Sequence, residues 1–412
     1  MTTASYEADP AEVHRVLLLY SGGLDTSVML KWIQEQYRAE VVALTVDLGQ
    51  PGEDYEVVRG KALDLGAADA RVVDARDEFA SEYVLRAIKA NAIYGLGYPL
   101  FTALGRPLIA EKAVSVARET GCDTIAHGCT GKGNDQVRIE ATIATLAPEL
   151  KVIAPVRSWQ MGREEEIAYA REHGIMVKGG SEVVPYSIDD NLWGRSSEGR
   201  WIEELDHAPE DDVFQLVTRP EEAPDEAETV SIGFERGAPA TLNGETLGLV
   251  ELLERAGEIG ARHGVGIVDH IEDRVVGLKV RDIYEVPAAA IVLTAHAELE
   301  RLVGTIHQNQ LKPMLDQRWA YLVYAGLWLE PLRSDLDAYM DAVNEQVTGE
   351  IALKLYKGSA RVVTRSSPNA VYDPQLATFA ESGGLFSQAA SPGFIELWSL
   401  QSRMAWRMRQ RG

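Results

Sequence analysis

Short apolar runs alternate with longer segments of helical period over the first 173 residues. Runs rich in valine and isoleucine, each of strand length, lie at residues 16–20, 41–46, 71–73, 124–126 and 152–154. Segments with apolar positions on one helical face lie between or after them, at residues 55–65, 78–92, 108–120 and 163–172. This alternation predicts a doubly wound α/β domain, with a parallel sheet covered by helices on both faces.

Beyond residue 200 the pattern changes. Residues 201–228 are acidic and contain three prolines, which indicates an exposed connection or lid. Strands are then expected at residues 229–234, 240–242, 275–280, 351–356 and 360–364, and helices at residues 249–263, 289–303 and 335–347. Hairpins beside long helices predict an α+β second domain.

The last segment of the chain predicts an amphipathic helix. Across residues 394–410, Leu397, Leu400, Met404 and Met408 recur on one side, and arginines lie nearby. Such a basic helix binds either an acidic membrane surface or an acidic neighbouring subunit, and the acidic chain favours a second copy of itself.

Charge and cysteine content narrow the class of protein. The 412 residues carry a formal net charge of −23, which opposes non-specific binding to nucleic acid or to an acidic membrane. Cys122 and Cys129 are the only cysteines, too few for a disulfide framework or a zinc quartet. The N-terminus lacks the apolar core of a signal peptide, and no uncharged run reaches membrane length, so a cytoplasmic protein is expected.

A glycine-rich stretch, Ser21-Gly22-Gly23-Leu24-Asp25-Thr26-Ser27, lies between the first expected strand and a helix. A strand that ends in such a turn points backbone N–H groups at the positive end of the helix dipole, where an anion binds. The alternative is an ordinary tight turn with Asp25 or Thr26 as the helix N-cap. Beside phosphate, the Asp25 carboxylate would act through Mg²⁺ or by orienting the loop.

A second polar stretch, residues 127–138, also begins where a strand ends and leads into a helix. Thr130 and Lys132 suit a carboxylate or phosphate, Asn134 donates and accepts, and Asp135 accepts from an amine. Arg138 suits a planar, bidentate partner. A solvated turn is the alternative, but so many functional side chains interleaved with glycines favour a binding loop.

These two stretches carry a family resemblance. The first loop resembles that of the ATP pyrophosphatases (the PP-loop superfamily), and neither loop matches a P-loop or a dinucleotide fingerprint. With Lys151–Pro155, Glu272-Asp273-Arg274 and Ile283-Tyr284-Glu285 added, the chain is similar to the argininosuccinate synthase family from residue 16 to its C-terminal helix. Members join L-citrulline to L-aspartate with ATP, releasing AMP and pyrophosphate.

The resemblance implies an organisation for the whole chain. A HUP-like, adenine-nucleotide-binding domain would span residues 14–178, a synthetase and multimerisation domain residues 179–390, and an oligomerisation helix residues 391–412. It implies a cytoplasmic homotetramer that uses ATP as substrate with Mg²⁺, acts on small molecules in arginine biosynthesis, and binds neither nucleic acid nor membrane. No set of metal-ligating side chains is expected.

The resemblance also assigns site residues. ATP would contact Leu19, Tyr20, Ser21, Gly22, Gly23, Leu24, Asp25, Thr26, Ser27, Val46 and Gly128. Aspartate would contact Thr130, Asn134 and Asp135. Citrulline would contact Tyr98, Thr102, Asn134, Arg138, Ser187, Ser196, Glu272 and Tyr284. In several relatives a hydroxyl residue stands where this chain has Ala103, and Thr102 is the neighbouring hydroxyl.

The chemistry of the implied reaction gives roles to three residues. A ureido carbon is a poor electrophile, so transfer of AMP to its oxygen divides one hard step into two. Asp25 and Lys132 would help to neutralise or orient the pyrophosphate. Asp135 would anchor the ammonium of aspartate or accept its proton, and anchoring is favoured because an ordinary aspartate is a weak base.

Two other functions fit parts of the sequence. Another adenylating enzyme of the superfamily, a tRNA thiolase or an amidotransferase synthetase, would need a basic face or a reactive cysteine, for which Cys129 is the candidate. A non-enzymatic nucleotide sensor would leave the second loop and the second domain unexplained.

Overall fold

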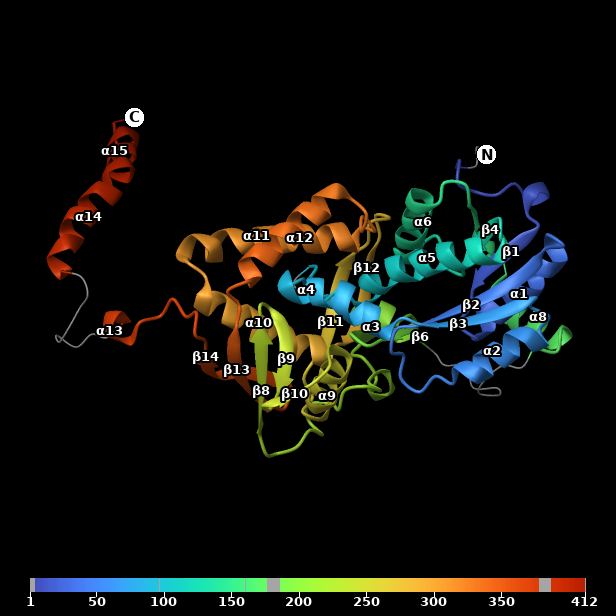
Figure 1. Ribbon diagram of the computed structural model, residues 1–412, viewed down its shortest axis with the longest axis horizontal. Coiled ribbons are helices and arrows are strands. Elements are labelled where there is room, and N and C mark those ends of the chain that lie inside the picture. Colours follow the sequence, from blue (N-terminus) through green and yellow to red (C-terminus); the bar gives the residue numbers. More distant parts are fainter. Residues whose placement is uncertain (1–3, 96, 160, 176–185, 378–386, 412) are drawn as a thin grey trace.

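The structure, a computed structural model, describes residues 4–95, 97–159, 161–175, 186–377 and 387–411. Its first part is built on a parallel sheet (Figure 1). The strands are β1 (Arg15–Leu19), β2 (Glu40–Asp47), β3 (Asp69–Asp74), β4 (Thr124–Ala126) and β5 (Lys151–Ile153). Their order is β3-β2-β1-β4-β5, and every neighbouring pair is parallel. The predicted doubly wound sheet is confirmed.

Helices cover both faces of this sheet. Successive side chains of a strand point to opposite faces, and the apolar residues of β1 point to both. Leu17 packs in a core with α5 (Phe101–Thr120) and α6 (Asp135–Leu146). Its neighbours Val16 and Leu18 pack on the opposite face, in a second core. That face is covered by α1 (Leu24–Gln36), α2 (Tyr55–Asp64) and α8 (Arg163–Glu172), and short elements η1 (Pro10–Glu12) and α7 (Pro155–Ser158) complete this part.

Helix α5 begins at Phe101, seven positions before the predicted start at residue 108. The prediction was wrong because Pro107 lacks an N–H group and usually ends or begins a helix. Here Pro107 is buried in the interior of α5, and the helix continues through it. The error matters for function, since the first turns of α5 carry Thr102 and Arg106.

The helix predicted at residues 78–92 is present as three joined pieces. These are α3 (Arg76–Glu78), the π-helical segment η2 (Phe79–Val84) and α4 (Leu85–Lys89). They lie against α9 (Leu249–Arg262), α10 (Pro287–Val303) and α12 (Pro331–Asn344). A segment of the first part of the sequence therefore belongs spatially to the second part.

The second part holds two antiparallel sheets. One has the order β11-β12-β7-β6, from β6 (Ser187–Asn191), β7 (Gly194–Glu198), β11 (Ile267–Asp273) and β12 (Lys279–Glu285). The other has the order β10-β9-β8-β13-β14, from β8 (Glu228–Glu235), β9 (Ala238–Leu242), β10 (Glu245–Thr246), β13 (Gly349–Tyr356) and β14 (Ser359–Ser366). Both predicted hairpins lie in the second sheet, and the α+β prediction is confirmed.

The strand predicted at residues 275–280 is displaced along the chain. Residues 275–278 form the turn between β11 and β12, closed by a 2.8 Å bond from the Arg274 N–H to the Leu278 carbonyl, and β12 begins only at Lys279. Polar residues at buried positions hide β11 from a hydrophobicity pattern, since its buried side chains are His270 and Glu272, whereas Ile271 is exposed. Strands β6 and β7 were missed for the same reason.

Helix α11 (Ile306–Tyr324) was also missed. Its interior contains Pro313, and its buried residues include Lys312 and Asp316, which form a 2.7 Å ion pair. A sequence pattern reads such residues as exposed. The short α13 (Pro374–Ala377) follows the second sheet.

The acidic connection at residues 201–228 is more than an exposed link. It contains η3 (Arg200–Glu203) and η4 (Asp211–Val213). Ile202 and Val213 are buried in a small cluster with Tyr186 and Ile283 of β12. The segment is therefore fastened to the four-stranded sheet.

One hydrophobic core runs from Leu17 of β1 to Leu355 of β13 and joins the two parts. The expected boundary at 178/179 lies outside the described residues. At the other expected boundary, 390/391, η5 (Gln388–Ala390) leads into α14 (Ser391–Trp398) and then α15 (Leu400–Arg409).

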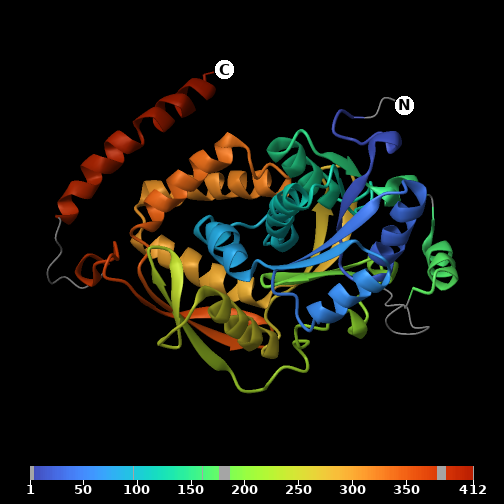
Figure 2. The same cartoon turned by 45° about the vertical axis from the view of Figure 1, so that its right-hand side comes forward.

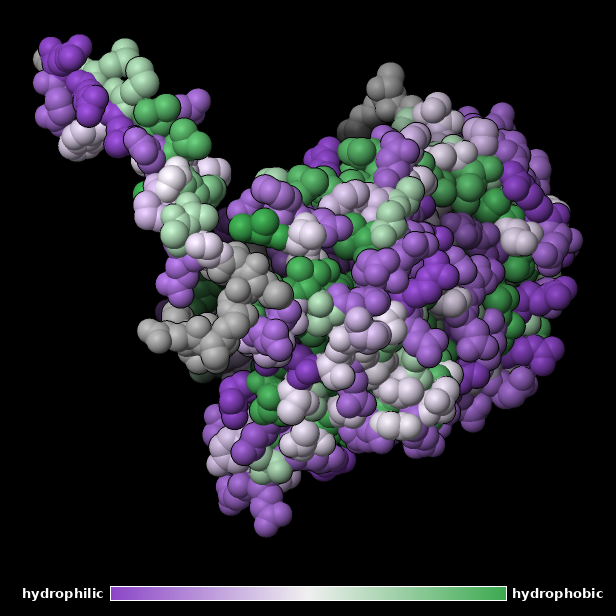
Figure 3. Space-filling view, turned by 60° about the vertical axis from the view of Figure 1, so that its left-hand side comes forward, coloured by the Kyte–Doolittle hydropathy of each residue, from purple (hydrophilic) through white to green (hydrophobic). Residues whose placement is uncertain are grey.

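Helices α14 and α15 project away from the body of the molecule, as two views of the ribbon show (Figures 1 and 2). Their large apolar side chains are exposed, with Leu397 75%, Trp398 79% and Met408 72% accessible. Figure 3 shows hydrophobic side chains along this projecting arm. The predicted amphipathic helix is present, with its apolar side uncovered in the single chain. Among the described residues, no helix has both the length and the apolar character needed to cross a membrane.

Candidate functional site

The two polar loops lie side by side at the carboxyl edge of the parallel sheet. One follows β1 and the other follows β4, and these strands are neighbours at the point where the strand order reverses. Ligands of doubly wound sheets bind in the crevice at this switch point. A cavity of about 900 Å³ opens there and extends to the four-stranded antiparallel sheet.

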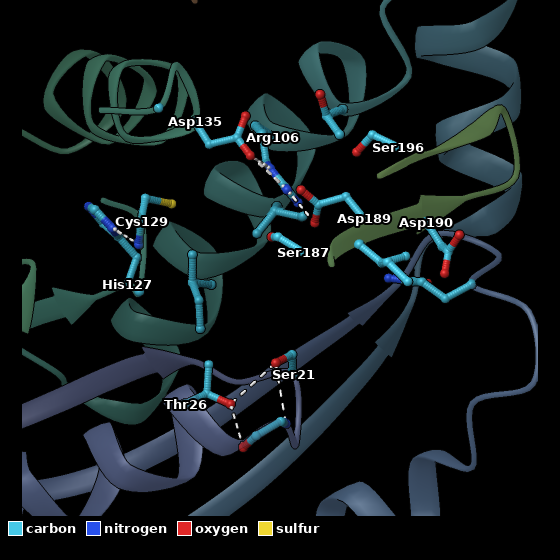
Figure 4. Close-up of a pocket in the computed structure, with 18 of the residues that line it drawn as sticks. Ser21, Thr26, Arg106, His127, Cys129, Asp135, Ser187, Asp189, Asp190 and Ser196 are labelled. Carbon is cyan, nitrogen blue, oxygen red and sulfur yellow. Dashed lines mark hydrogen bonds and ion pairs between the residues drawn. The ribbon is translucent and has the colours of Figure 1, made fainter. Parts of the chain in front are cut away.

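The first loop is shaped to hold an anion. Gly23 is the N-cap of α1, and glycine has no side chain that could cap the helix. Within the described residues, no side chain therefore caps the N–H groups of the first turn of α1, which suits them to bind an anion. The buried Ser27 hydroxyl lies 2.6 Å from the Gly23 carbonyl and 3.0 Å from the Tyr20 hydroxyl, so it braces the loop. Ser21 and Thr26 bond to each other at 3.2 Å on the cavity side (Figure 4).

Gly22 sets the shape of this loop. Its φ is +76°, a conformation that side-chain-bearing residues rarely adopt. Its carbonyl accepts a 2.8 Å bond from the Lys61 ammonium on α2. Asp25, in the first turn of α1, is exposed and lines the cavity.

The second loop starts from a buried polar network. The His127 Nε2 atom lies 2.9 Å from a Glu140 oxygen on α6, and the Cys129 N–H donates to His127 Nδ1 at 3.2 Å. Arg157 contributes a 2.6 Å ion pair to the same carboxylate. These contacts fix the backbone from which Gly128, Cys129 and Thr130 line the cavity.

Asp135 is held between two guanidinium groups. Arg106 of α5 donates to one carboxylate oxygen at 2.7 Å, and Arg138 of α6 donates to the other at 2.8 Å. Arg106 also pairs with Asp189 of β6 at 2.8 Å, as Figure 4 shows. Burial opposes ionisation of Asp135, but the two guanidinium groups outweigh it and lower its pKa to about 2.

Arg138 is itself 3% exposed and ties the loop to α11. Its Nε atom donates to the Tyr324 carbonyl at 3.1 Å, and its Cζ atom lies 5.1 Å from the centre of the Tyr324 ring. Within the described part of the chain, its NH2 group makes no hydrogen bond. A buried donor of this kind suits a polar group of a ligand in the cavity.

Asn134 connects the second loop with the antiparallel sheet. Its amide nitrogen lies 3.1 Å from Glu272 of β11 and 2.8 Å from the Tyr324 hydroxyl, and its oxygen accepts from the Val275 N–H at 3.0 Å. The Tyr324 hydroxyl also donates to Glu272 at 2.6 Å. The Asn134 side chain, which is predicted to contact both aspartate and citrulline, is thus buried between the two sheets.

An acidic cluster lines the far side of the cavity. It consists of Glu198 of β7, Glu272 of β11 and Asp282 of β12. The Arg274 guanidinium pairs with Glu198 and lies 3.6 Å from Asp282, and the Tyr284 hydroxyl bonds to Glu272. Burial and the neighbouring carboxylates raise the pKa of Asp282 to about 7, against the opposing effect of Arg274.

Ala103 and its neighbour Thr102 lie in different surroundings. Ala103 is fully buried in the core of α5, whereas Thr102 lines the cavity. The Thr102 hydroxyl bonds to the Tyr98 hydroxyl and lies 3.4 Å from Arg138 NH1. Burial raises the pKa of Tyr98 to about 12, so the phenol stays protonated at neutral pH.

The structure gathers nearly all predicted site residues around this one cavity. Those that line it are Leu19, Tyr20, Ser21, Gly23, Leu24, Asp25, Thr26, Val46, Tyr98, Thr102, Gly128, Thr130, Asn134, Asp135, Arg138, Ser187, Ser196, Glu272 and Tyr284. Gly22 and Ser27 are buried and do not line the cavity, and the exposed Lys132 is not among the lining residues either. The Lys132 carbonyl is 3.4 Å from Arg274 NH1.

Several lining residues were not singled out from the sequence. They are Arg106, Asp189, Glu198, Arg274 and Asp282, with Tyr324 as a partner outside the lining. The Asp273-Arg274 pair was noticed only as part of a family motif. Arg106 had no local signal, because its helix was expected to begin two residues after it.

The fold and the site define a class first: an α/β protein with an adenine-nucleotide-binding HUP domain of the PP-loop kind. Residues 15–176 match the family model described as the arginosuccinate synthase N-terminal HUP domain, and residues 186–405 match the arginosuccinate synthase C-terminal domain. The chain belongs to the argininosuccinate synthase family.

Individual relatives agree with that placement. The chain is 57% identical to the argininosuccinate synthase of Rubrobacter xylanophilus over 389 residues, covering 94% of each chain. It is 50% identical to that of Pyrococcus furiosus over 394 residues, 96% of this chain and 95% of the relative. It is 49% identical to that of Symbiobacterium thermophilum over 390 residues, which cover 95% of this chain and 97% of the relative. The similarity therefore spans both parts of the fold.

The loop geometry predicts that Gly22→Ala weakens ATP binding. A methyl group at φ +76° would lie 3.1 Å from Val58, and relaxing the backbone would turn the neighbouring N–H groups away from the phosphates. An alanine in this left-handed conformation is strained by about 1–2 kcal/mol. If ATP binding must restore that conformation, the Kd for ATP should rise about tenfold, which calorimetric titration would measure.

Gly121→Ala is the matched control. Gly121, at the C-terminus of α5, has a similar φ of +69°, its Cβ would meet open space and it lies outside the cavity lining, so ATP affinity should not change. Unaltered ATP affinity in Gly22→Ala, with the fold intact by circular dichroism, would contradict the role given to this loop.

Proposed function

We propose that this protein is an argininosuccinate synthase, a carbon–nitrogen ligase that condenses L-citrulline with L-aspartate in arginine biosynthesis. ATP is cleaved to AMP and pyrophosphate, and citrulline is activated as its adenylate. The observation that carries the proposal is the single cavity in which the glycine-rich loop, the Asp135 loop and the acidic cluster face one another. Its volume of about 900 Å³ lies at the large end of ligand pockets, as three substrates require.

In the first step, the ureido oxygen of citrulline attacks the α-phosphorus of ATP. The N–H groups at the start of α1, with the Ser21 and Thr26 hydroxyls, hold the leaving pyrophosphate. The unpartnered NH2 group of Arg138 and the Thr102 hydroxyl bind and orient the citrulline side of the reacting pair. The Lys132 ammonium would bind phosphate by moving from its exposed position toward the cavity.

In the second step, the amine of aspartate attacks the activated carbon and AMP leaves. Asp135, with a pKa of about 2, remains anionic and anchors the aspartate ammonium, while Thr130 and Asn134 bind beside it. A carboxyl group this acidic holds a proton poorly at neutral pH, so its role is orientation rather than general-base catalysis. The phosphate of the adenylate is then the alternative acceptor of the proton.

Mg²⁺ fits the donor set of the first loop. Among the described residues, no group of three or more His, Cys, Asp or Glu side chains is arranged to hold a metal. Mg²⁺ bound through substrate phosphates needs only one or two protein carboxylates, and Asp25 supplies one at the cavity wall. When bound there, the ion neutralises charge on the pyrophosphate.

Two further properties belong to the proposal. The chain divides near residue 178 into a nucleotide-binding domain and a synthetase domain, with residues 391–412 as an assembly helix.

The enzyme works in a reducing cytoplasm, where Cys122 and Cys129 stay free thiols. Burial raises the pKa of the Cys129 thiol, so it stays protonated at neutral pH, which disfavours sulfur transfer as the function.

The direct test is incubation with citrulline, aspartate and ATP. Argininosuccinate, AMP and pyrophosphate should form in equal amounts, and omission of citrulline should abolish AMP formation. With ¹⁸O in the ureido group, the label should appear in AMP. Label that stays out of AMP would refute the adenylate, and absence of argininosuccinate would refute the proposed function.

The anchoring role predicts the kinetics of Asp135→Asn. Loss of the charge should raise the KM for aspartate by about 10- to 100-fold, the worth of one charge-assisted hydrogen bond, with little change for citrulline. Steady-state kinetics with each substrate varied would measure this. A fall in turnover at saturating aspartate, with normal KM, would instead indicate base catalysis.

Asp189→Asn serves as the comparison for Asp135→Asn. It removes the other carboxylate that pairs with Arg106 but leaves Asp135 in place. We expect a clearly smaller rise in the KM for aspartate. Equal effects of the two variants would mean that general loss of charge, and not the anchor, is responsible.

We also propose a homotetramer in which α14 and α15 lie against other subunits. Two observations support this: the apolar side chains of the arm are exposed in the single chain, and its arginines complement a chain of net charge −23.

Removal of residues 392–412 should therefore lower the molar mass measured by light scattering. The double variant Leu397→Ser, Trp398→Ser keeps the chain length while removing apolar surface, and it should lower the mass as well. Circular dichroism would verify that the body stays folded. An unchanged mass for the shortened chain would contradict this role for the arm.

A further inference from the structure

His127 is the first residue of the second loop, yet no substrate contact is predicted for it. It is 1% exposed and lines the cavity. Its Nε2 atom lies 2.9 Å from Glu140 of α6, which is 5% exposed, and its Nδ1 atom lies 3.2 Å from the Cys129 nitrogen (Figure 4). A buried imidazole that is bonded at both nitrogens is restricted to one orientation.

The partners of His127 also decide which of its nitrogens carries the proton. A backbone N–H group only donates, so the Cys129 N–H makes Nδ1 the acceptor. The Glu140 oxygen that faces Nε2 is also paired with the Arg157 guanidinium at 2.6 Å, so this oxygen accepts and Nε2 donates. The imidazole is therefore neutral, with its single N–H on Nε2, and Glu140 fixes this tautomer.

The same carboxylate reaches the far end of the loop through Arg157. The guanidinium of Arg157 pairs with Glu140 and also donates to the Gln136 side-chain oxygen at 2.9 Å. The Gln136 amide in turn donates to the Gly133 carbonyl at 3.2 Å. The backbone from Cys129 to Gly133 is thus held at both ends from one carboxylate.

The bond to Nδ1 sets the direction of the Gly128 carbonyl. The peptide bond between Gly128 and Cys129 is trans, so its C=O and N–H groups point in opposite directions. Because the N–H group points at His127, the carbonyl points away from the imidazole. Glycine restrains the rotation of this peptide less than any other residue would. The orientation of the peptide therefore depends on its partner, His127.

We propose that His127 is a positioning residue for ATP: its Nδ1 atom holds the Gly128–Cys129 peptide in the orientation that the nucleotide requires, and Glu140 holds its tautomer. The inference rests on the ATP binding of the proposed function, in which the main chain at Gly128 contacts the nucleotide, and deepens it. The imidazole acts through the peptide and takes no part in bond making. A side chain with an acceptor at the place of Nδ1 can therefore replace it.

The first experiment compares His127→Asn with His127→Gln. The shorter asparagine places its carbonyl oxygen near the position of Nδ1, where it accepts from the Cys129 N–H but does not reach Glu140. Glutamine reaches Glu140 but places no acceptor beside that N–H group. Calorimetric titration with ATP should give a Kd for His127→Gln about tenfold higher than for His127→Asn, the worth of one hydrogen bond.

Thermal unfolding separates positioning from a purely structural role. Glutamine is nearer to histidine in size and keeps the bond to Glu140, so His127→Gln should be the more stable of the two variants. The order of stability should thus be opposite to the order of ATP affinity. The KM for citrulline should change little in either variant, because the predicted citrulline contacts lie outside residues 127–133.

His263→Gln is the matched control. His263 is 3% exposed, and its Nε2 atom lies 2.9 Å from Glu228, the same distance that separates His127 from Glu140. It lies at the end of α9, outside the cavity lining. The control should leave the Kd for ATP unchanged. A Kd raised as much as in His127→Gln would assign the effect to the loss of a buried histidine in general and overturn the inference.

The unaltered protein offers a test that needs no variant. Labelled with ¹⁵N in its cysteines and histidines, it should give two cysteine amide signals, because Cys122 and Cys129 are the only cysteines. The Cys122 N–H donates to the Ala117 carbonyl oxygen, so only the Cys129 amide should show a scalar coupling to an imidazole nitrogen. Cysteine amide signals without this coupling would overturn the inference, even if neither variant folds.

The outcomes separate this inference from the proposed function. If the unaltered protein forms argininosuccinate but the two variants bind ATP equally well, or His127→Asn binds it more weakly, the inference is overturned and the function stands. If ATP affinity follows the expected order but no argininosuccinate forms, the proposed function fails and the role of His127 in nucleotide binding stands.

Discussion

The site depends on the ion-pair chain that passes through Asp135. Arg138 and Arg106 hold its two oxygens, and Arg106 continues to Asp189 of the antiparallel sheet. These contacts connect the second loop of the parallel sheet with α5, α6 and β6. Arg138 is the buried member of this chain, and removal of Asp135 would leave its guanidinium without a carboxylate partner, which destabilises the fold. The relative position of the two sheets and the charge state of the loop are therefore set together.

Charge is arranged in three zones along the cavity. The start of α1 offers N–H groups and hydroxyls that suit phosphate. The middle holds Asp135 between guanidinium groups, and the far side holds Glu198, Glu272 and Asp282 with Arg274. A net charge of −23 is no obstacle to anionic substrates, because the field at each zone is governed by groups within a few ångströms. Under the proposed function each zone would hold a different group of the substrates, and holding reactants in one geometry lowers the barrier to their condensation.

Prediction from sequence succeeded where chemistry lies in contiguous residues. The glycine-rich loop and residues 127–138 were placed correctly at strand ends, since a short apolar run followed by a polar, glycine-rich turn has a strong local signature. Prediction failed where burial is decided by distant partners. Helix α11 was missed because its core includes Lys312 and Asp316, and β11 was missed because its buried positions hold the polar residues His270 and Glu272. Ser187, Ser196 and Tyr284 entered only through family resemblance.

The sequence by itself determined the fold class, the position of the two polar loops at strand ends and the family, because each is encoded by local pattern or by long contiguous motifs. Only the tertiary structure decided which side chains meet. It placed Arg106 on Asp135, although 29 positions separate them, and Asn134 on Glu272, which lies 138 positions away. It also lowered the pKa of Asp135 and raised that of Asp282, two ordinary aspartates in the sequence. A carboxyl group responds to the dielectric and to the charges around it, and those neighbours exist only once the chain has folded.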